Sequence, residues 1–199
     1  MNTPAQSSYP AGPATDRGQP QPRQRLAVRA DEPRIATLMR SSVLELFPNF
    51  YDERQTLSAA RYIAHVDRTL IDDGTYFVHE VDEQIVACGG WSKRDRLYTG
   101  SDPGGDDARL LDPATEPARV RAMFVRGDWT RRGLGRAILE SCERAARDAG
   151  FHTLALMATL PGVPLYRSFG FVDVETTTVT MPDSVNIDCV AMRRPISVG

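Results

Sequence analysis

Two glycines and three arginines gather where an apolar run of residues gives way to a helical pattern, at 131–136. The start of a helix leaves about four backbone N–H groups unpaired and carries roughly half a positive charge. Gly133 and Gly135 lack the Cβ atoms that would keep a phosphate away from those amides, and the arginines add positive charge. The segment therefore predicts an anion-binding loop for which a diphosphate is the natural ligand. The loop consists of Arg131, Arg132, Gly133, Leu134, Gly135 and Arg136.

The glycine spacing does not match two other phosphate-binding motifs. A dinucleotide fingerprint needs a third glycine where this chain has Ile138, and an acidic residue about twenty positions further on, where the chain reads Phe151-His152-Thr153. A Walker loop needs Gly-Lys-Ser/Thr at its end, but Gly127 is followed five residues later by Arg132. A structural alternative stays open, in which the glycines only allow the helix to pack closely on a sheet.

The elements that position this loop alternate between strands and helices. Leu134, Ile138, Cys142 and Ala145 lie on one face of a helix predicted over 132–149, and the preceding run 120–125 reads as a strand. The pattern predicts a mixed α/β domain with a strand-loop-helix unit in its middle. The other predicted helices cover 31–47, 56–72 and 165–169, and the other predicted strands cover 26–28, 75–81, 84–91, 153–158, 171–181 and 189–192, with Asp82-Glu83 as a hairpin turn.

Two segments lack the apolar pattern of the rest. Residues 1–25 contain no Leu, Ile, Val or Phe and five prolines, so we expect a disordered tail, with the folded domain at 26–199. Residues 92–118 carry several prolines, glycines and aspartates without apolar periodicity, which is typical of a long functional or disordered loop.

Composition excludes several classes of protein. The 199 residues carry a net charge of −2, which disfavours a general nucleic-acid binder. No apolar run approaches the ~20 residues of a membrane span, and the amino terminus lacks the apolar region of a secretory signal. Cys88, Cys142 and Cys189 lie far apart, which suits neither a disulfide framework nor a zinc site. We therefore expect a cytoplasmic protein with reduced thiols and no metal.

Two motifs, in the same order along the chain, resemble those of the superfamily of GCN5-related N-acetyltransferases (GNAT). The family signature Gln/Arg-x-x-Gly-x-Gly/Ala follows a central strand, and here Thr130-Arg131-Arg132-Gly133-Leu134-Gly135 departs from it only at Thr130. Further on, Tyr166-Arg167-Ser168-Phe169-Gly170-Phe171 is similar to the family's Tyr-x-x-x-Gly-Phe signature. The opening Arg29-Ala30-Asp31, followed by a helix, also looks like that family, so the resemblance covers roughly 26–192.

The resemblance implies a twisted, mostly antiparallel sheet that splays open between two parallel strands and is flanked by helices, with acetyl-coenzyme A in the cleft. The backbone of 131–136 would then hold the pyrophosphate, and Met123, Phe124 and Val125 would pair with the pantetheine arm. The Val125 N–H would polarise the thioester carbonyl. Tyr166 stands where the family places the phenol that protonates the coenzyme A thiolate; its alternative is a tyrosine packed against the sheet.

A general base is not evident from the residues. Many members of the family place a glutamate early on the central strand, where this chain has Arg119 and Arg121. Glu116 lies just upstream and is the candidate base, although a solvated loop carboxylate is its alternative reading. His79 alternates with Phe77 on a predicted strand, which favours a core or edge histidine.

The resemblance also implies an acceptor site formed by 46–55 and the loop 92–118. Phe47, Phe50 and Tyr51 could wall an apolar pocket there, with ordinary packing as the alternative. The expected partner is a small-molecule or peptide amine, and whether the chain forms a homodimer stays open. A second class of function also stays open, a non-catalytic acyl-coenzyme A sensor on the same fold.

Overall fold

The computed structural model describes residues 21–95 and 109–197. The predicted tail therefore lies outside the described residues as far as residue 20, and the long loop lies outside them at 96–108.

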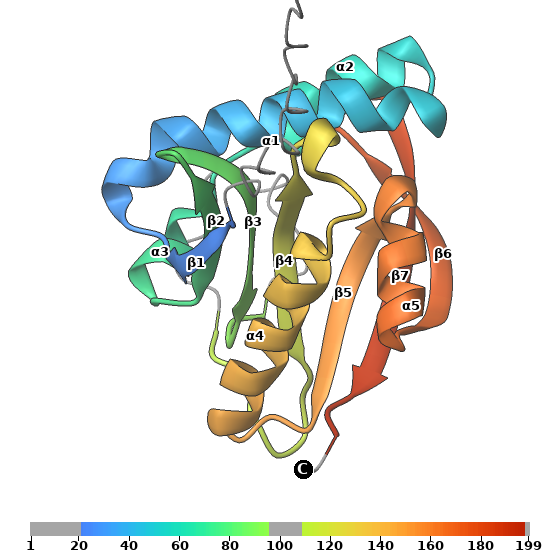
Figure 1. Cartoon of the computed structure of the whole chain (residues 1–199). Coiled ribbons are helices and arrows are strands. Elements are labelled where there is room, and N and C mark those ends of the chain that lie inside the picture. Colours follow the sequence, from blue (N-terminus) through green and yellow to red (C-terminus); the bar gives the residue numbers. More distant parts are fainter. Residues whose placement is uncertain (1–20, 96–108, 198–199) are drawn as a thin grey trace, which may run out of the picture.

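Seven strands form one sheet within the described part of the chain, in the order β1-β2-β3-β4-β5-β7-β6 (Figure 1). Only β4 and β5 are parallel neighbours, and the other pairs are antiparallel. The predicted mixed α/β class and the mostly antiparallel sheet are thus confirmed. The strands are β1 (Arg23–Leu26), β2 (Tyr76–Val81), β3 (Gln84–Ser92), β4 (Ala118–Val125), β5 (Thr153–Thr159), β6 (Val172–Thr180) and β7 (Asn186–Pro195).

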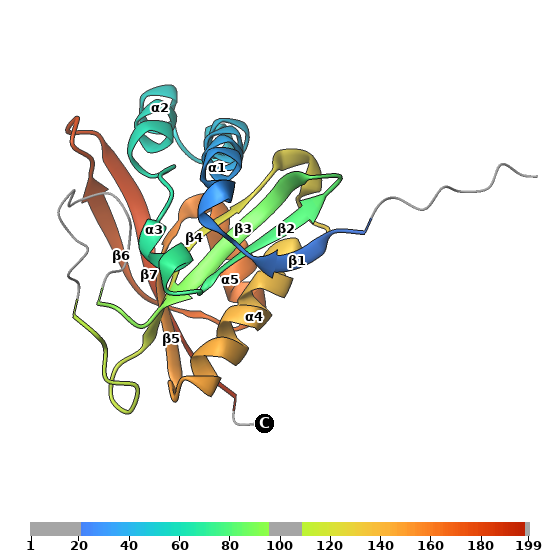
Figure 2. The ribbon, with the colours of Figure 1, turned by 90° about the vertical axis from the view of Figure 1, so that its left-hand side faces the viewer.

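Helices cover both faces of the sheet (Figure 2). The α-helices are α1 (Glu32–Leu46), α2 (Glu53–Tyr62), α3 (Arg68–Asp72), α4 (Leu134–Asp148) and α5 (Val163–Phe169). Short 3-10 turns are η1 (Arg29–Asp31), η2 (Phe47–Asn49), η4 (Gly127–Trp129) and η5 (Leu160–Gly162). One apolar core lies under α4 and α5, and two smaller clusters lie on the other face, under α1, α2 and α3. No helix among the described residues is long and apolar enough to cross a bilayer.

The hairpin predicted at Asp82-Glu83 is confirmed. Both residues have positive φ angles, 46° and 63°, which is the backbone of the tight turns that match the twist of paired strands. The turn brings β2 and β3 into antiparallel register, from Val81 opposite Gln84 onward.

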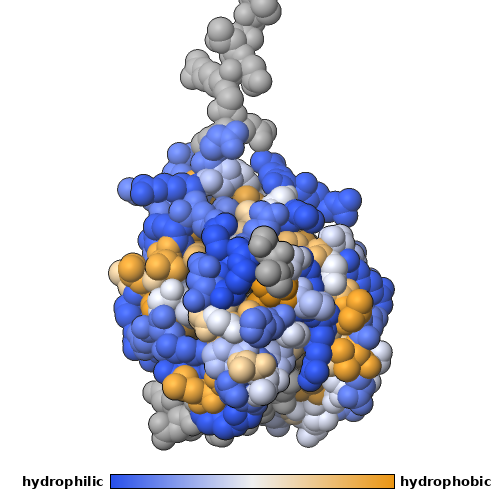
Figure 3. Space-filling model, turned by 90° about the horizontal axis from the view of Figure 1, so that it is seen from below, coloured by the Kyte–Doolittle hydropathy of each residue, from blue (hydrophilic) through white to orange (hydrophobic). Residues whose placement is uncertain are grey.

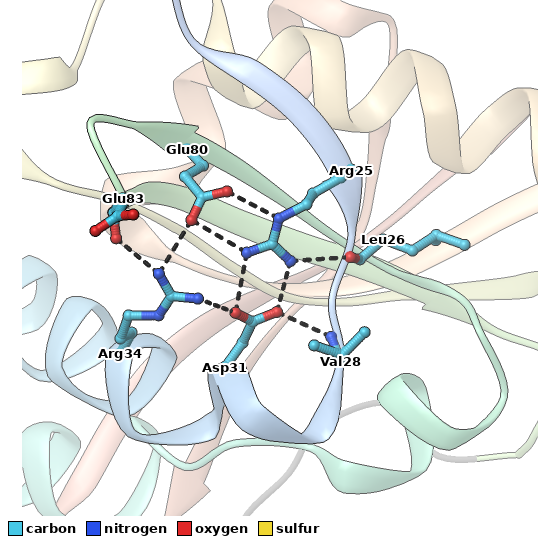
Figure 4. A network of polar contacts seen from close by, with 7 residues as sticks. All are labelled: Arg25, Leu26, Val28, Asp31, Arg34, Glu80 and Glu83. Carbon is cyan, nitrogen blue, oxygen red and sulfur yellow. Dashed lines mark hydrogen bonds and ion pairs between the residues drawn. The ribbon is translucent and has the colours of Figure 1, made fainter.

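The first strand begins earlier than predicted. It covers Arg23–Leu26 rather than 26–28, because these four residues pair with β2 from Glu80 to Phe77. A polar network around Arg25 adds to this pairing (Figure 4). Its guanidinium donates to Asp31 at 2.6 Å and to Glu80 on β2 at 2.9 Å. Asp31 also accepts from Arg34 and from the Val28 N–H. The network joins β1, the start of α1 and β2, so the folded part of the chain reaches back to Arg23.

The helix predicted over 56–72 is two helices, and that expectation was wrong. The α2 helix ends at Tyr62, and Asp67 has an extended backbone that starts α3. Asp67, at this break, forms a buried ion pair with Arg121 of β4. The apolar spacing of this segment is helical, but spacing alone does not record such a tertiary contact.

The two ends of the molecule differ. Figure 3 views it from the end away from α1 and α2, where hydrophilic residues predominate and apolar ones lie in small scattered groups. The carboxyl ends of β4 and β5 point toward the opposite end (Figure 1), where the candidate site lies.

Candidate active site

The parallel strands β4 and β5 are hydrogen-bonded only at their starts. The ladder pairs Ala118 with Leu154 and Arg119 with Ala155, and no further pairs are found between these two described strands. Beyond that point the strands diverge (Figure 1). A cavity of about 660 Å³ occupies the divergence and is lined by Val120 to Val125 of β4 and by Met157 and Thr159 of β5. The splay implied by the resemblance is thus present.

The β4 strand carries a bulge at the point where it leaves β5. The β3–β4 register passes from Cys88 opposite Phe124 to Gly90 opposite Arg121, so β4 has one residue more than β3 here. Ala122 has a positive φ of 54°, and its carbonyl accepts a hydrogen bond from the Tyr76 hydroxyl at 3.0 Å. The bulge therefore has a buried partner that holds it in place, and it lies within the stretch of β4 that lines the cavity.

The predicted anion-binding loop lies at one end of the cavity. Gly133 is the N-cap of α4 with φ +82°, and a Cβ placed on it would meet no atom within 4 Å. The first α4 backbone hydrogen bond runs from the Ala137 N–H to the Gly133 carbonyl, so the three N–H groups before it have no partner within the helix. Open space therefore lies in front of a helix N-terminus, which fits a phosphate group.

The three arginines of the loop are arranged differently from one another. Arg131 lines the cavity and has φ 63°. The Arg132 guanidinium stacks on the Trp129 ring, 4.5 Å from its centroid. Arg136 also lines the cavity and forms an exposed ion pair of 3.2 Å with Glu140. Positive charge thus surrounds the helix start, and all three residues remain at least partly available to solvent.

Gly135 has different surroundings from Gly133. A Cβ on Gly135 would lie 2.8 Å from the Leu165 side chain of α5. The alternative in which a glycine only allows close packing therefore fits Gly135, because this glycine lets α4 approach α5. Of these two glycines, only Gly133 borders open space that a phosphate could occupy.

Tyr166 of α5 lines the cavity and is 8% exposed. Its ring packs edge-on against Phe171 at 5.8 Å, and a Cβ on Gly162 would lie 2.8 Å from the ring. No partner hydrogen-bonds to its hydroxyl within residues 21–95 and 109–197. Burial, with a smaller contribution from Cys142, raises the pKa of the phenol well above its ordinary value. Tyr166 is therefore a protonated phenol at the wall of the cavity.

Glu116 does not come together with the other predicted residues. Both of its carboxylate oxygens accept from Arg109, at 2.6 and 2.8 Å, and one also accepts from the Asp112 N–H. These hydrogen bonds, Arg109 first, lower the pKa of Glu116 to about 2. Glu116 precedes β4 and does not line the cavity among the described residues. It is an ion-paired loop carboxylate, which makes it a weak base.

His79 is a core histidine, as its alternation with Phe77 predicts. It is buried on β2, and burial lowers the pKa of its imidazole. It is not among the residues that line the cavity.

The other end of the cavity contains residues that the sequence indicates only in part. Phe47 and Phe50 line it, as the apolar-pocket reading suggests. Tyr51 instead anchors this wall, since its hydroxyl accepts from the Leu160 N–H at 2.8 Å and donates to the Asp188 carbonyl at 2.7 Å. Sequence reasoning missed the remaining residues of this end, which come from four separate elements and linkers. They are Ser42, Tyr62, Ile63, Val179, Met181 and Cys189.

In the sequence, Arg121 is notable only because it lies where the resemblance leads us to expect a glutamate. It lines the cavity from β4, and its guanidinium lies 2.8 Å from the Asp67 carboxylate. The feature of the sequence that could have indicated Arg121 is a charged residue between the apolar residues Val120 and Ala122. Most predicted site residues do share the one cavity: Met123, Phe124, Val125, Arg131, Gly133, Leu134, Gly135, Arg136 and Tyr166.

No group of three or more His, Cys, Asp or Glu side chains that could hold a metal ion occurs in the described part of the chain. The polar groups at the loop end of the cavity include backbone amides, arginines and the Tyr166 phenol. They suit an anionic ligand with a polar arm.

Comparisons with known proteins agree with this geometry. A sequence model described as the acetyltransferase (GNAT) family matches residues 39–171. No curated protein sequence matches the chain. A GCN5-related N-acetyltransferase structure from Rhodopseudomonas palustris is 17% identical, with a TM-score of 0.64 over 87% of this chain and 95% of its own. The PaiA N-acetyltransferase of Thermoplasma acidophilum, solved with coenzyme A, is 12% identical, with a TM-score of 0.60 over 88% and 99%. The structure of yncA from Salmonella typhimurium with its cofactor acetyl-CoA is 16% identical, with a TM-score of 0.59 over 90% and 96%.

Proposed function

The chain belongs to the acetyltransferase (GNAT) family, and on that premise we propose that it transfers an acetyl group from acetyl-coenzyme A to an amine. The observation that carries the proposal is the edge of β4 beyond Arg119, which has lost β5 as its partner and borders the cavity. An unpaired strand edge is a template for an extended, amide-containing chain. The pantetheine arm of coenzyme A is such a chain.

The residues at the cavity fit the two ends of this substrate. The N-terminus of α4, with Gly133 at its cap and arginines beside it, would hold the pyrophosphate. Met123, Phe124 and Val125 would pair with the pantetheine amides. The backbone N–H of Val125 would donate to the thioester carbonyl, and a single donor of this kind is typically worth ~3 kcal/mol of barrier.

The proposed reaction is direct attack in a ternary complex. The lone pair of an uncharged amine forms the new C–N bond, and the C–S bond to coenzyme A breaks. The departing sulfur takes a proton from the Tyr166 phenol, and the nitrogen loses its extra proton to water, from which Tyr166 is reprotonated. The position of Tyr166 supports this role, because its side chain lines the same cavity as Val125. Burial raises the pKa of the phenol, so it is protonated before the thiolate appears.

The test has two parts, binding and turnover. Calorimetry should detect acetyl-CoA binding to the full chain, and a thiol reagent should detect free coenzyme A when an amine panel is added. Binding with no thiol release across the panel would favour the alternative, a non-catalytic acyl-coenzyme A sensor. Failure to bind acetyl-CoA would overturn both readings.

A further inference from the structure

One half of the cavity is walled by apolar side chains. We define this acceptor half by Phe47, Phe50, Ile63, Val179 and Met181, all of which line the cavity. Four of them belong to one apolar cluster, in which side chains from η2 and the α2–α3 linker pack with those of β6 and the turn after it. Phe50 is the fifth and is 47% exposed, so it lies at the rim.

No carboxylate lines the cavity within the described ranges. The charged residues of the lining are Arg121, Arg131 and Arg136. The Arg121 side chain is only 1% exposed and is ion-paired with Asp67, so it adds little net charge to the cavity. The positive charge of the lining therefore lies at the loop, away from the acceptor half, and the described lining offers an ammonium ion no group of opposite charge.

The apolar walls and the lack of a carboxylate in the described lining act on an amine in the same direction. An ammonium ion that enters the acceptor half loses much of its hydration, and no carboxylate of the described lining compensates for that loss. The neutral form of the amine is therefore favoured. A neutral amine on an apolar body does not meet this penalty. It also arrives with the free lone pair that acetyl transfer requires, so the enzyme would not need to remove a proton before the attack.

The size of the cavity limits the acceptor further. The whole cavity measures about 660 Å³, in the range of a site for one drug-sized ligand. The pantetheine arm would occupy part of that volume. The acceptor would have to share the cavity with that arm, which favours a small molecule over a large one.

Resting on the proposed function, we infer that the acceptor is a small apolar amine that binds uncharged. Phe50 at the rim and the walls behind it hold the body of the amine, and the lack of a carboxylate in the described lining selects against its ammonium form. The site discriminates in this way against polyamines, through their additional charges, and against peptides, through the polar backbone that follows the amine.

The test compares two acceptors with one body. The probes are 2-phenylethylamine and its 2,2-difluoro analogue, whose fluorines lower the pKa of the amine but preserve its shape. At pH 7 the difluoro analogue should have a kcat/KM at least about threefold higher, because more of it is uncharged. The advantage should vanish as the pH approaches the pKa of the parent amine. Spermidine and an alanyl peptide amide, at pH 7, should be acetylated at least about tenfold less efficiently than either.

A matched pair of variants tests whether Phe50, at the rim, determines which acceptor is preferred. Phe50→Glu adds a carboxylate to the acceptor half and should lower kcat/KM for 2-phenylethylamine about tenfold while raising it for spermidine. Leu57→Glu is the control, because Leu57 is similarly exposed at 54% but does not line the cavity. It should leave both values unchanged.

The outcomes separate this inference from the function on which it rests. Acetyl-CoA binding with preferred acetylation of spermidine or the peptide would overturn the inference alone. Equal effects of Phe50→Glu and Leu57→Glu on both acceptors would also overturn the inference and leave the proposed function in place. Loss of acetyl-CoA binding in the wild-type chain would overturn the proposed function, and the inference with it.

Discussion

The guanidinium of Arg121 lies 2.8 Å from the carboxylate of Asp67, and no more than 2% of either side chain is exposed. Removing one member of such a pair leaves a buried charge without its main compensation. Asp67→Ala should therefore lower the free energy of unfolding by about 3 kcal/mol. Urea unfolding followed by circular dichroism measures the change.

The double variant Asp67→Leu/Arg121→Met is the control for this pair. It replaces both charges by apolar side chains of similar volume, so its stability should lie within about 1 kcal/mol of the wild type. Equal destabilisation by the single and the double variant would mean that packing around 63–67, rather than the ion pair, stabilises this region.

Tyr166→Phe removes one hydroxyl and leaves the ring in its packing against Phe171. Loss of a general acid should lower kcat about 10²-fold, and the Kd for acetyl-CoA should stay unchanged because the hydroxyl acts on the leaving sulfur. Burial raises the pKa of Tyr166, so the wild-type rate should show no loss through ionisation of Tyr166 up to about pH 9.5. Steady-state kinetics and calorimetry test both statements. An unchanged kcat would exclude Tyr166 from the reaction.

Gly133 and Gly74 form a matched pair for the anion-binding loop. Both have positive φ, +82° and +67°, and a Cβ on either would meet no atom within 4 Å. Gly133→Ala and Gly74→Ala should each cost about 1 kcal/mol of stability. Only Gly133→Ala should weaken acetyl-CoA binding, by about tenfold, because only its Cβ enters the space of the phosphates. Equal Kd values in the two variants would show that the pyrophosphate binds elsewhere.

Asp31 gives a stability that depends on pH. Its side chain is fully buried, and hydrogen bonds from Arg25, with smaller help from the Val28 N–H, lower the pKa of its carboxyl to about 2. A lowered pKa in the folded state means that ionised Asp31 stabilises the fold above about pH 4. This contribution, about 2 kcal/mol, is lost as the pH falls toward 2.

Asp31→Asn should therefore destabilise the protein at pH 7, and the difference from the wild type should shrink toward pH 2.5. Urea unfolding at pH 7, 4 and 2.5 measures it. Asp72→Asn is the control, because Asp72 pairs with Arg29 at the surface, and its effect should stay below about 0.5 kcal/mol at each pH. If Asp31→Asn lowers the free energy of unfolding by the same amount at every pH, the ionised Asp31 carboxylate is not the source of this pH-dependent stability.

Local patterns in the sequence predict the elements that carry the cofactor end of the site. The run 120–125, the two glycines after it and the apolar face of 132–149 all lie close together in the chain. Their periodicity therefore specifies a strand, a loop and a helix without long-range information. The motif that contains Tyr166 is equally local, and Tyr166 does line the cavity with Val125 and Gly133.

The acceptor half could not be predicted in the same way. Its walls come from residues as distant as Phe47 and Met181, and no short pattern links them. The break between α2 and α3 coincides with a contact between Asp67 and Arg121, more than fifty residues apart, and apolar spacing does not record such a contact. The different reasons for Gly133 and Gly135 also required the position of Leu165, which belongs to another helix.

The most direct test of the central claim counts both products of one reaction. The full chain is incubated with acetyl-CoA and 2-phenylethylamine, the free coenzyme A thiol is titrated, and mass spectrometry quantifies the acetylated amine. We expect the two products in equal amounts, with both formed much more slowly by Tyr166→Phe. Release of thiol without acetylated amine, or acetyl-CoA that stays intact with this amine and with every other amine of the panel, would contradict the proposed acetyl transfer.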